Sequence, residues 1–118
     1  MSYDVSFKVK AEGIDRFVRV GECSINITWN ARDIITKSTG LEWKNEENNG
    51  LCKDIIPKIE AGLLELRRNG SKYKKYESPN GWGTVAGTIR FFRAVLDAWD
   101  ILLAEDEELA GVATFWIE

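Results

Sequence analysis

Histidine is absent from the 118 residues of this chain. Because imidazole is the usual general base near neutral pH and the commonest transition-metal ligand, its absence excludes Ser-His and Cys-His nucleophile pairs and most hydrolase mechanisms. Two carboxylates could still act as acid and base, and Asp97 and Asp100 share one face of a predicted helix. The same spacing also suits a solvated helix flank beside Arg93. We therefore expect no catalytic residue, no metal site and no cofactor, and hence a protein that is not an enzyme.

Cysteine is scarce, and long hydrophobic runs are missing. Cys23 and Cys52 have no spacing typical of a zinc site and are too few for a disulfide scaffold, so we expect reduced, buried thiols. No apolar stretch approaches the ~18 residues that cross a bilayer, and no charged start leads into an apolar run. The net charge of -3 gives no global attraction to nucleic acid or to an anionic membrane. These patterns predict a cytoplasmic protein without a membrane partner.

The residues that are present fit one domain over residues 1–118, since 44% of them are hydrophobic. Apolar and polar residues alternate over residues 5–10, which is the period of a half-buried strand. A second stretch, residues 17–29, is rich in β-branched residues, and Gly21 is a candidate bulge within it. A turn at residues 12–15 would join the two strands as a hairpin.

Helical spacing of apolar residues follows the hairpin. Asn30 is placed to cap a short helix over residues 31–39. Two longer helices are predicted over residues 51–69 and 84–103, where apolar residues recur every three or four positions. Pro57 lies inside the first of these, and we expect it to make the first turn irregular because proline lacks a backbone N–H.

The remaining segments complete the predicted order. Residues 45–50 are rich in asparagine and glutamate and predict a surface loop. Residues 105–108 are all acidic and predict a break, after which residues 112–117 read as a final strand. The fold class is therefore α+β, with a small antiparallel sheet (the N-terminal hairpin plus the C-terminal strand) packed with two long helices and one short helix.

The most distinctive motif is the turn Ser78-Pro79-Asn80-Gly81-Trp82-Gly83, which lies immediately before the second long helix. Proline fixes one backbone torsion, and asparagine and glycine adopt torsions that other residues resist. The turn therefore presents one large aromatic ring from a stiff backbone. Its ring could pack against the fold or remain at the surface.

A first hypothesis is that the chain binds another protein. Partly exposed tryptophans are typical interface anchors, and Trp43, Trp82 and Trp116 are candidates. The final strand, if exposed, could extend the sheet of a partner. Core packing is the alternative role for each of these rings.

A second hypothesis is a small-ligand or anion site at the Asn80–Gly83 turn and the following helix start. The amides of Gly83, Thr84 and Val85 would point outward at the positive end of the helix dipole. Asn30 and Asn80 could complete this site if the end of the second strand lies nearby.

A third hypothesis concerns a basic cluster that two tyrosines interrupt. Basic residues beside stackable rings suit single-stranded nucleic acid, but cations also stabilise a helix C-terminus and solubilise a loop. For that reason we do not expect nucleic acid to be the main partner. The cluster consists of Arg67, Arg68, Lys72, Lys74 and Lys75, with Tyr73 and Tyr76 between them.

Several of these motifs together resemble a family of small uncharacterised bacterial and phage-associated proteins. The resemblance covers residues 25–104 and is carried by Thr28-Trp29-Asn30 and by Pro79-Asn80-Gly81-Trp82-Gly83 before an apolar helix. The helix that carries Pro57, Ala61-Gly62, Leu63 and Leu66, followed by Tyr76, also contributes. The resemblance implies a phage or mobile-element association and carries no reaction, substrate or cofactor.

Overall fold

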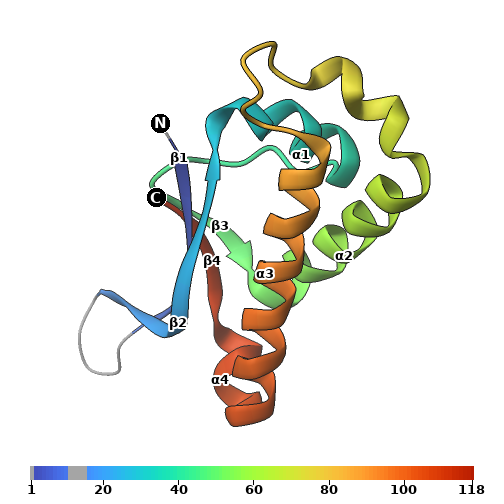
Figure 1. Cartoon of the computed structure of the whole chain (residues 1–118). Coiled ribbons are helices and arrows are strands. Elements are labelled where there is room, and N and C mark those ends of the chain that lie inside the picture. Colours follow the sequence, from blue (N-terminus) through green and yellow to red (C-terminus); the bar gives the residue numbers. More distant parts are fainter. Residues whose placement is uncertain (1, 11–15) are drawn as a thin grey trace.

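A computed structural model describes residues 2–10 and 16–118, with the side chains of all of these except residues 22–24. Figure 1 shows its two layers, a sheet with the helices gathered against one face. The elements, in chain order, are β1 (Ser2–Lys10), β2 (Phe17–Thr28), the 3-10 turn η1 (Trp29–Ala31), α1 (Arg32–Thr39), β3 (Glu47–Leu51), α2 (Cys52–Asn69), the 3-10 segment η2 (Gly70–Tyr76), α3 (Val85–Glu105), α4 (Glu107–Val112) and β4 (Thr114–Ile117).

The sheet is antiparallel and has the strand order β2-β1-β4-β3. The predicted α+β class is confirmed, and so is the pairing of the N-terminal strands with a C-terminal strand. Alternation along β1 and β4 places Val5 and Phe7, together with Phe115 and Ile117, in the core beneath the helices. The predicted turn at residues 12–15 lies outside the described residues, as does the side chain of Cys23. Cys52 is fully buried, as predicted.

The predicted bulge in β2 is confirmed. Val5 pairs with Ile25, whereas Phe7 pairs with Val20, so β2 contains more residues than β1 between the two pairs. Gly21 begins this irregular stretch with a φ of 73°. Glycine adopts such a torsion without the steric cost that a Cβ imposes.

The predicted loop at residues 45–50 is wrong, because β3 begins at Glu47 and pairs with β4. Asn48 lies opposite Trp116, and the Asn49 side chain accepts a hydrogen bond from Lys44 N at 2.7 Å and donates to Lys44 O at 2.9 Å. The strand is short and mostly exposed at the sheet edge. It therefore lacks the apolar alternation by which a half-buried strand is recognised.

Several element boundaries also differ from the predicted ones. Asn30 is not the cap of α1: the chain enters η1, and Thr28 Oγ1 accepts a hydrogen bond from Asn30 N at 3.4 Å. The acidic break starts the short helix α4, because Asp106 Oδ1 accepts from Leu109 N at 3.0 Å. The last strand consequently begins at Thr114 and not at residue 112.

The three main helices pack closely where Gly62 of α2 lies. A Cβ on Gly62 would be 2.5 Å from Thr39 Cγ2 and 3.2 Å from Phe92 Cε2. Only glycine therefore lets α1 and α3 approach α2 at this level. Helix α2 also contains Pro57 within its span and remains one helix from Cys52 to Asn69. Both layers contribute to one hydrophobic core.

The other face of the sheet carries a charged cluster around Glu118. The Glu118 carboxylate forms an ion pair with Lys8 and a 3.1 Å contact with Arg19 Nη2. The hydrogen bond from Lys8 lowers the pKa of Glu118, burial opposes this, and the charges of Lys8 and Arg19 lower it further. Lys8 Nζ also lies 4.5 Å from the ring centroid of Trp116. This cluster ties β1, β2 and the end of β4 together on the side without helices.

The lowered pKa makes this cluster sensitive to acid. A carboxyl group whose pKa is lower in the folded state stabilises the fold above its unfolded pKa and loses that contribution as pH falls through its folded pKa. We expect Glu118→Gln to lower the free energy of unfolding by about 0.5–1 kcal/mol at pH 7. The difference from wild type should shrink as the pH falls below the unfolded pKa of a glutamate, about 4.3, and should vanish only below the lower pKa of Glu118 in the folded state. Urea unfolding across this pH range measures both values.

Glu60→Gln is the control, since Glu60 is exposed on α2 and forms no ion pair with a described residue. Its difference from wild type should be small at every pH. A Glu118→Gln difference that stays constant from neutral to acid pH would contradict the role of the Glu118 charge.

Candidate functional site

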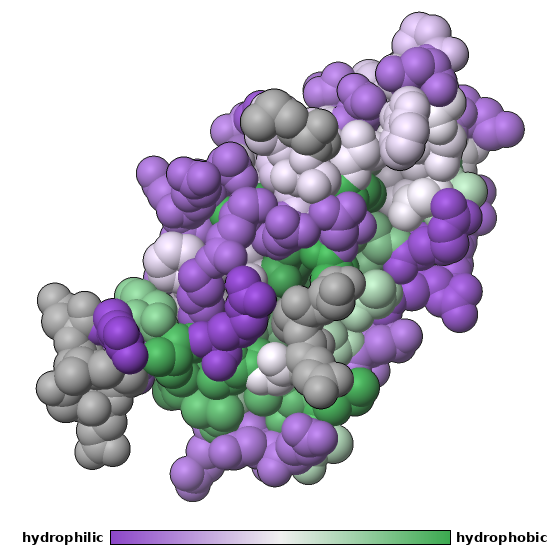
Figure 2. Space-filling view, turned by 60° about the vertical axis from the view of Figure 1, so that its left-hand side comes forward, coloured by the Kyte–Doolittle hydropathy of each residue, from purple (hydrophilic) through white to green (hydrophobic). Residues whose placement is uncertain are grey.

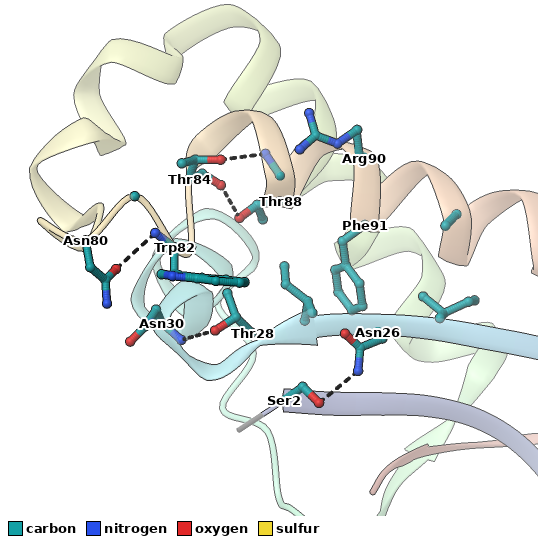
Figure 3. Close-up of a pocket in the computed structure, with 16 residues that line it drawn as sticks. Ser2, Asn26, Thr28, Asn30, Asn80, Trp82, Thr84, Thr88, Arg90 and Phe91 are labelled. Carbon is teal, nitrogen blue, oxygen red and sulfur yellow. Dashed lines mark hydrogen bonds between the residues drawn. The ribbon is translucent and has the colours of Figure 1, made fainter.

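A cleft with a volume of about 810 Å³ lies between β2 and α3, and the turn before α3 closes one end (Figure 3). It is assembled from three segments that are far apart in the sequence. The lining residues are Ser2, Ile25, Asn26, Ile27, Thr28, Asn30, Asn80, Gly81, Trp82, Gly83, Thr84, Gly87, Thr88, Arg90, Phe91 and Ala94. Four of the predicted site residues, namely Asn30, Asn80, Trp82 and Gly83, therefore meet in one place.

Trp82 stands on a backbone that is fixed by its neighbours. Gly81 N donates to Ser78 O at 3.1 Å, which closes the turn, and Trp82 N donates to Asn80 Oδ1 at 3.0 Å. Gly81 and Gly83 have φ values of 82° and 74°, so the predicted need for glycine at both positions is confirmed. The ring itself is 65% exposed. The turn therefore fixes the backbone at Trp82 and leaves the side chain at the surface.

Gly83 joins this turn to the end of β2. A Cβ on Gly83 would lie 2.5 Å from the carbonyl carbon of Asn30 and 2.7 Å from Ala31 N. Such a close backbone approach is possible only without a side chain. The contact places Asn30 beside Asn80, as the small-ligand hypothesis required, and Figure 3 shows the Trp82 ring above Thr28 and Asn30.

Two backbone N–H groups at the start of α3 donate hydrogen bonds to side chains of the same chain. Gly87 N donates to Thr84 Oγ1 at 2.9 Å, and Val85 N donates to the Glu77 carboxylate at 2.7 Å. The predicted outward amide of Val85 is therefore wrong. Because the Glu77 carboxylate already supplies negative charge at the positive end of this helix, an anion gains little there. The anion form of the small-ligand hypothesis loses its main support.

The cleft is polar at its rim and apolar at its floor. Ile25, Ile27 and Phe91 are buried and form the floor. Among the described residues that line the cleft, only Arg90 carries a charge. Arg90 is exposed on α3 and forms no ion pair with a described carboxylate. A ligand with a carboxylate would therefore find an unpaired guanidinium at this rim.

The other two predicted tryptophan anchors lie elsewhere. Trp43 packs with ring-centroid distances of 5.6 Å to Phe91, 5.9 Å to Tyr3 and 6.0 Å to Phe115. Its Nε1 is buried without a hydrogen-bond partner among the described residues. Trp43 is therefore half-buried and packed against the core, and we do not propose it as a binding anchor. Trp116 lies on the face of the sheet without helices, where its Nε1 donates to Thr114 Oγ1 at 2.8 Å.

The basic cluster is exposed at the end of α2 and in η2, but neither tyrosine is fully exposed: Tyr76 is half-buried, with Lys75 Nζ 5.3 Å from its ring centroid. Tyr73 is buried and donates to Glu65 Oε1 at 3.0 Å. Burial and this carboxylate raise the pKa of Tyr73. Because stacking of bases requires accessible rings, the arrangement does not favour single-stranded nucleic acid. The exposed cations are Arg67, Arg68, Lys72, Lys74 and Lys75.

The sequence interpretation missed Asn26 and Arg90 as lining residues. A signal for the α3 wall is present in the spacing of Gly83, Gly87 and Ala94, which are small residues on one side of the helix start and helix. Small residues on a helix leave space above them. Asn26 gives no such signal, because a strand sequence does not reveal which strand will lie at the sheet edge.

Comparison of the chain with protein-family models, with curated proteins and with solved structures found no match. The resemblance to a phage-associated family therefore stays a prediction. No helix in the described part of the chain has the length and apolar character needed to span a membrane. Within residues 2–10 and 16–118, outside the undescribed side chains, no group of three or more Cys, Asp or Glu is arranged to hold a metal ion. The functional argument depends on the cleft itself.

The contact between Gly83 and Asn30 can be tested with a matched pair of variants. We expect Gly83→Ala to lower the free energy of unfolding by about 2–5 kcal/mol, because the strained φ and the overlap with the Asn30 backbone both contribute. Gly81→Ala introduces a Cβ at a similar φ with no atom within 4 Å, so about 1–2 kcal/mol is expected. Thermal and urea unfolding measure the two effects. Equal losses would contradict the role of the close contact.

Proposed function

We propose that the chain is a non-enzymatic binding module that holds a segment of another protein in the cleft beside Trp82. The observation that carries the proposal is that this ring is 65% exposed while its backbone is fixed by Asn80 and two glycines. An aromatic ring on a preorganised backbone has only two side-chain torsions to order on binding, and it buries a large area. Such rings are frequent hot spots of protein interfaces.

The chemistry of the cleft supports binding without catalysis. Its side chains are mainly amides, hydroxyls and apolar groups, and no described lining residue is a carboxylate, thiol or imidazole. General acid–base catalysis needs a group whose pKa lies near the working pH, and a guanidinium is not such a group. The lining residues can therefore bind a partner through hydrogen bonds and through burial of apolar surface.

A small ligand is the second candidate for the same cleft. Its volume of about 810 Å³ falls within the range of known ligand pockets. Amide side chains at Asn30 and Asn80 offer donors and acceptors for a neutral polar molecule. The Asn26 amide is already engaged, because its Nδ2 donates to Ser2 Oγ and to Asp4 Oδ1, each at 2.8 Å. A shift of the melting temperature in a screen of neutral polar metabolites would favour this candidate over a protein segment.

The proposal keeps two expectations from the sequence. The first is a cytoplasmic location, which agrees with a buried thiol at Cys52. The second is an association with phages or other mobile elements, which the resemblance over residues 25–104 implies. Expression of a tagged chain in bacteria followed by cell fractionation would test the location directly.

Removal of the Trp82 ring should abolish partner capture without unfolding the chain. We expect Trp82→Ala to change the free energy of unfolding by less than about 0.5 kcal/mol, because an exposed side chain contributes little to the core. We expect it to weaken partner binding by about 2 kcal/mol or more. Quantitative mass spectrometry of affinity captures from cell lysate measures retention, and chemical unfolding measures stability.

Ile101→Ala is the matched control, since Ile101 is 58% exposed on α3 and does not line the cleft. A genuine partner should be retained by wild type and by Ile101→Ala and lost by Trp82→Ala. Equal retention by all three proteins would exclude Trp82 as the anchor.

A further inference from the structure

Strand β2 forms one edge of the sheet, because β1 is its only neighbour among the described strands, whose order is β2-β1-β4-β3. An edge strand carries backbone N–H and C=O groups that no strand of its own sheet satisfies. Natural proteins usually cover or shorten such edges. The register shows which backbone groups of β2 point away from the sheet.

The pairing of β1 with the chain end fixes this orientation. Asp4 N donates to Glu118 O at 2.9 Å, and Glu118 N donates to Asp4 O at 2.8 Å. The backbone groups of Asp4 therefore point toward β4. Because these groups alternate in direction along an antiparallel strand, those of Tyr3 and Val5 point toward β2.

The same alternation then applies to β2. Tyr3 lies opposite Ile27 and Val5 opposite Ile25, so the two isoleucines bond to β1. The backbone N–H groups of Asn26 and Thr28 consequently point outward, together with the carbonyl of Asn26. None of these groups bonds to another described backbone group outside its own strand or helix.

This free edge opens into the cleft. Residues 25–28 form one continuous wall of it, and α3 forms the opposite wall (Figure 3). The Trp82 ring lies at the end of this wall, above Thr28. An extended chain placed along the edge would therefore run between β2 and α3 and would meet the Trp82 ring with one of its side chains.

We propose that the occupant of the cleft is an extended peptide segment of a partner protein that pairs with the free edge of β2 at Asn26 and Thr28. Its side chain near the turn packs on Trp82, and a carboxylate of the segment bonds to Arg90. The inference rests on the proposed function and adds the conformation and the charge of the partner segment. Strand addition supplies main-chain hydrogen bonds for affinity, and side-chain contacts supply specificity.

Two observations favour a partner segment over a second copy of this chain. The β2 edge is recessed at residues 25–28, since the turn that carries Trp82 and helix α3 stand beside it there and would also flank the same residues of a second copy. Two recessed edges obstruct one another, whereas a single extended strand fits between the walls. The unpaired guanidinium of Arg90 is the only charge among the described lining residues, and it selects an acidic segment.

Thr28 allows a test that removes one outward N–H and leaves the sheet intact. Its φ of -64° matches the value that proline imposes, so Thr28→Pro fits the backbone. Thr28→Ala is the matched control, because both variants lose the hydroxyl that accepts from Asn30 N and only proline also lacks the N–H. Circular dichroism confirms that each variant is folded.

The probe is a set of peptides selected on the wild-type protein from a displayed library of short random sequences. We expect acidic residues to be enriched among them. Fluorescence polarisation should show binding to Thr28→Ala within about threefold of wild type and binding to Thr28→Pro weakened by about tenfold or more. Arg90→Ala should weaken the binding of the acidic peptides to a similar degree.

A second measurement covers the case in which Thr28→Pro does not fold. Hydrogen exchange of the wild-type protein, read by NMR, should show the amide protons of Asn26 and Thr28 exchanging rapidly in the free protein and slowly with peptide bound. The amides of Ile25 and Ile27 should be protected in both states, because they already bond to β1.

The outcomes separate this inference from the proposed function. Peptides that depend on Trp82 but bind Thr28→Pro and Thr28→Ala equally, with no new protection of Asn26, would overturn strand addition and leave the cleft as a protein-binding site. A concentration-dependent dimer that protects the Asn26 amide without peptide would assign the edge to a second copy. Failure to select any Trp82-dependent peptide, with no partner captured from lysate, would reject both proposals.

Discussion

The close backbone contact of Gly83 with Asn30 and Ala31 is the constraint on which the functional geometry depends. It fastens the turn before α3 to the point where β2 ends, so the two walls of the cleft have a fixed relation. Had residue 83 carried a side chain, the turn would stand away from η1, and Trp82 would no longer lie over Thr28. The Glu77 carboxylate also holds the turn to α3, because it accepts a hydrogen bond from Val85 N at the first turn of that helix. The contacts of Gly83 and Glu77 together thus position helix α3, the Trp82 ring and the edge of β2.

Local sequence determined the strands of the hairpin, the long helices and the turn residues. Alternation around Val5 and Phe7 is typical of a half-buried strand, and it can be recognised in a single sequence. The glycines at 81 and 83 likewise indicate a turn with positive φ values. Strand β3 could not be predicted in this way, because it pairs with β4, which lies far away in the chain. Its asparagines satisfy their own backbone, as loop residues do, and its exposed edge position requires no apolar face. Long-range contacts therefore decided the one strand, among the described residues, that was missed.

The candidate site was likewise predictable where its residues are close in sequence, and not where it depends on the order of the strands. Asn80, Trp82 and Gly83 belong to one motif, so the sequence could identify them together, and Asn30 could be added as the end of a predicted strand. The final strand was a reasonable candidate for strand addition until its place in the sheet was known. β4 lies between β1 and β3 and has no free edge, whereas β2 has one. Which strand lies at the edge is a property of the sheet order, and no residue in β2 encodes it locally.

An exposed indole and an unpaired strand edge are both unfavourable in an isolated domain, since the first leaves apolar area in water and the second invites aggregation. The turn that carries Trp82 requires positive φ at Gly81 and Gly83, yet the ring contributes little to the core. Fold stability alone therefore does not explain why a tryptophan stands at this position. Recession of the β2 edge between α3 and the ring reconciles the two features, because it obstructs sheet-to-sheet contact between copies and still admits one narrow chain. A segment that fills the cleft would bury the ring and satisfy the edge at the same time.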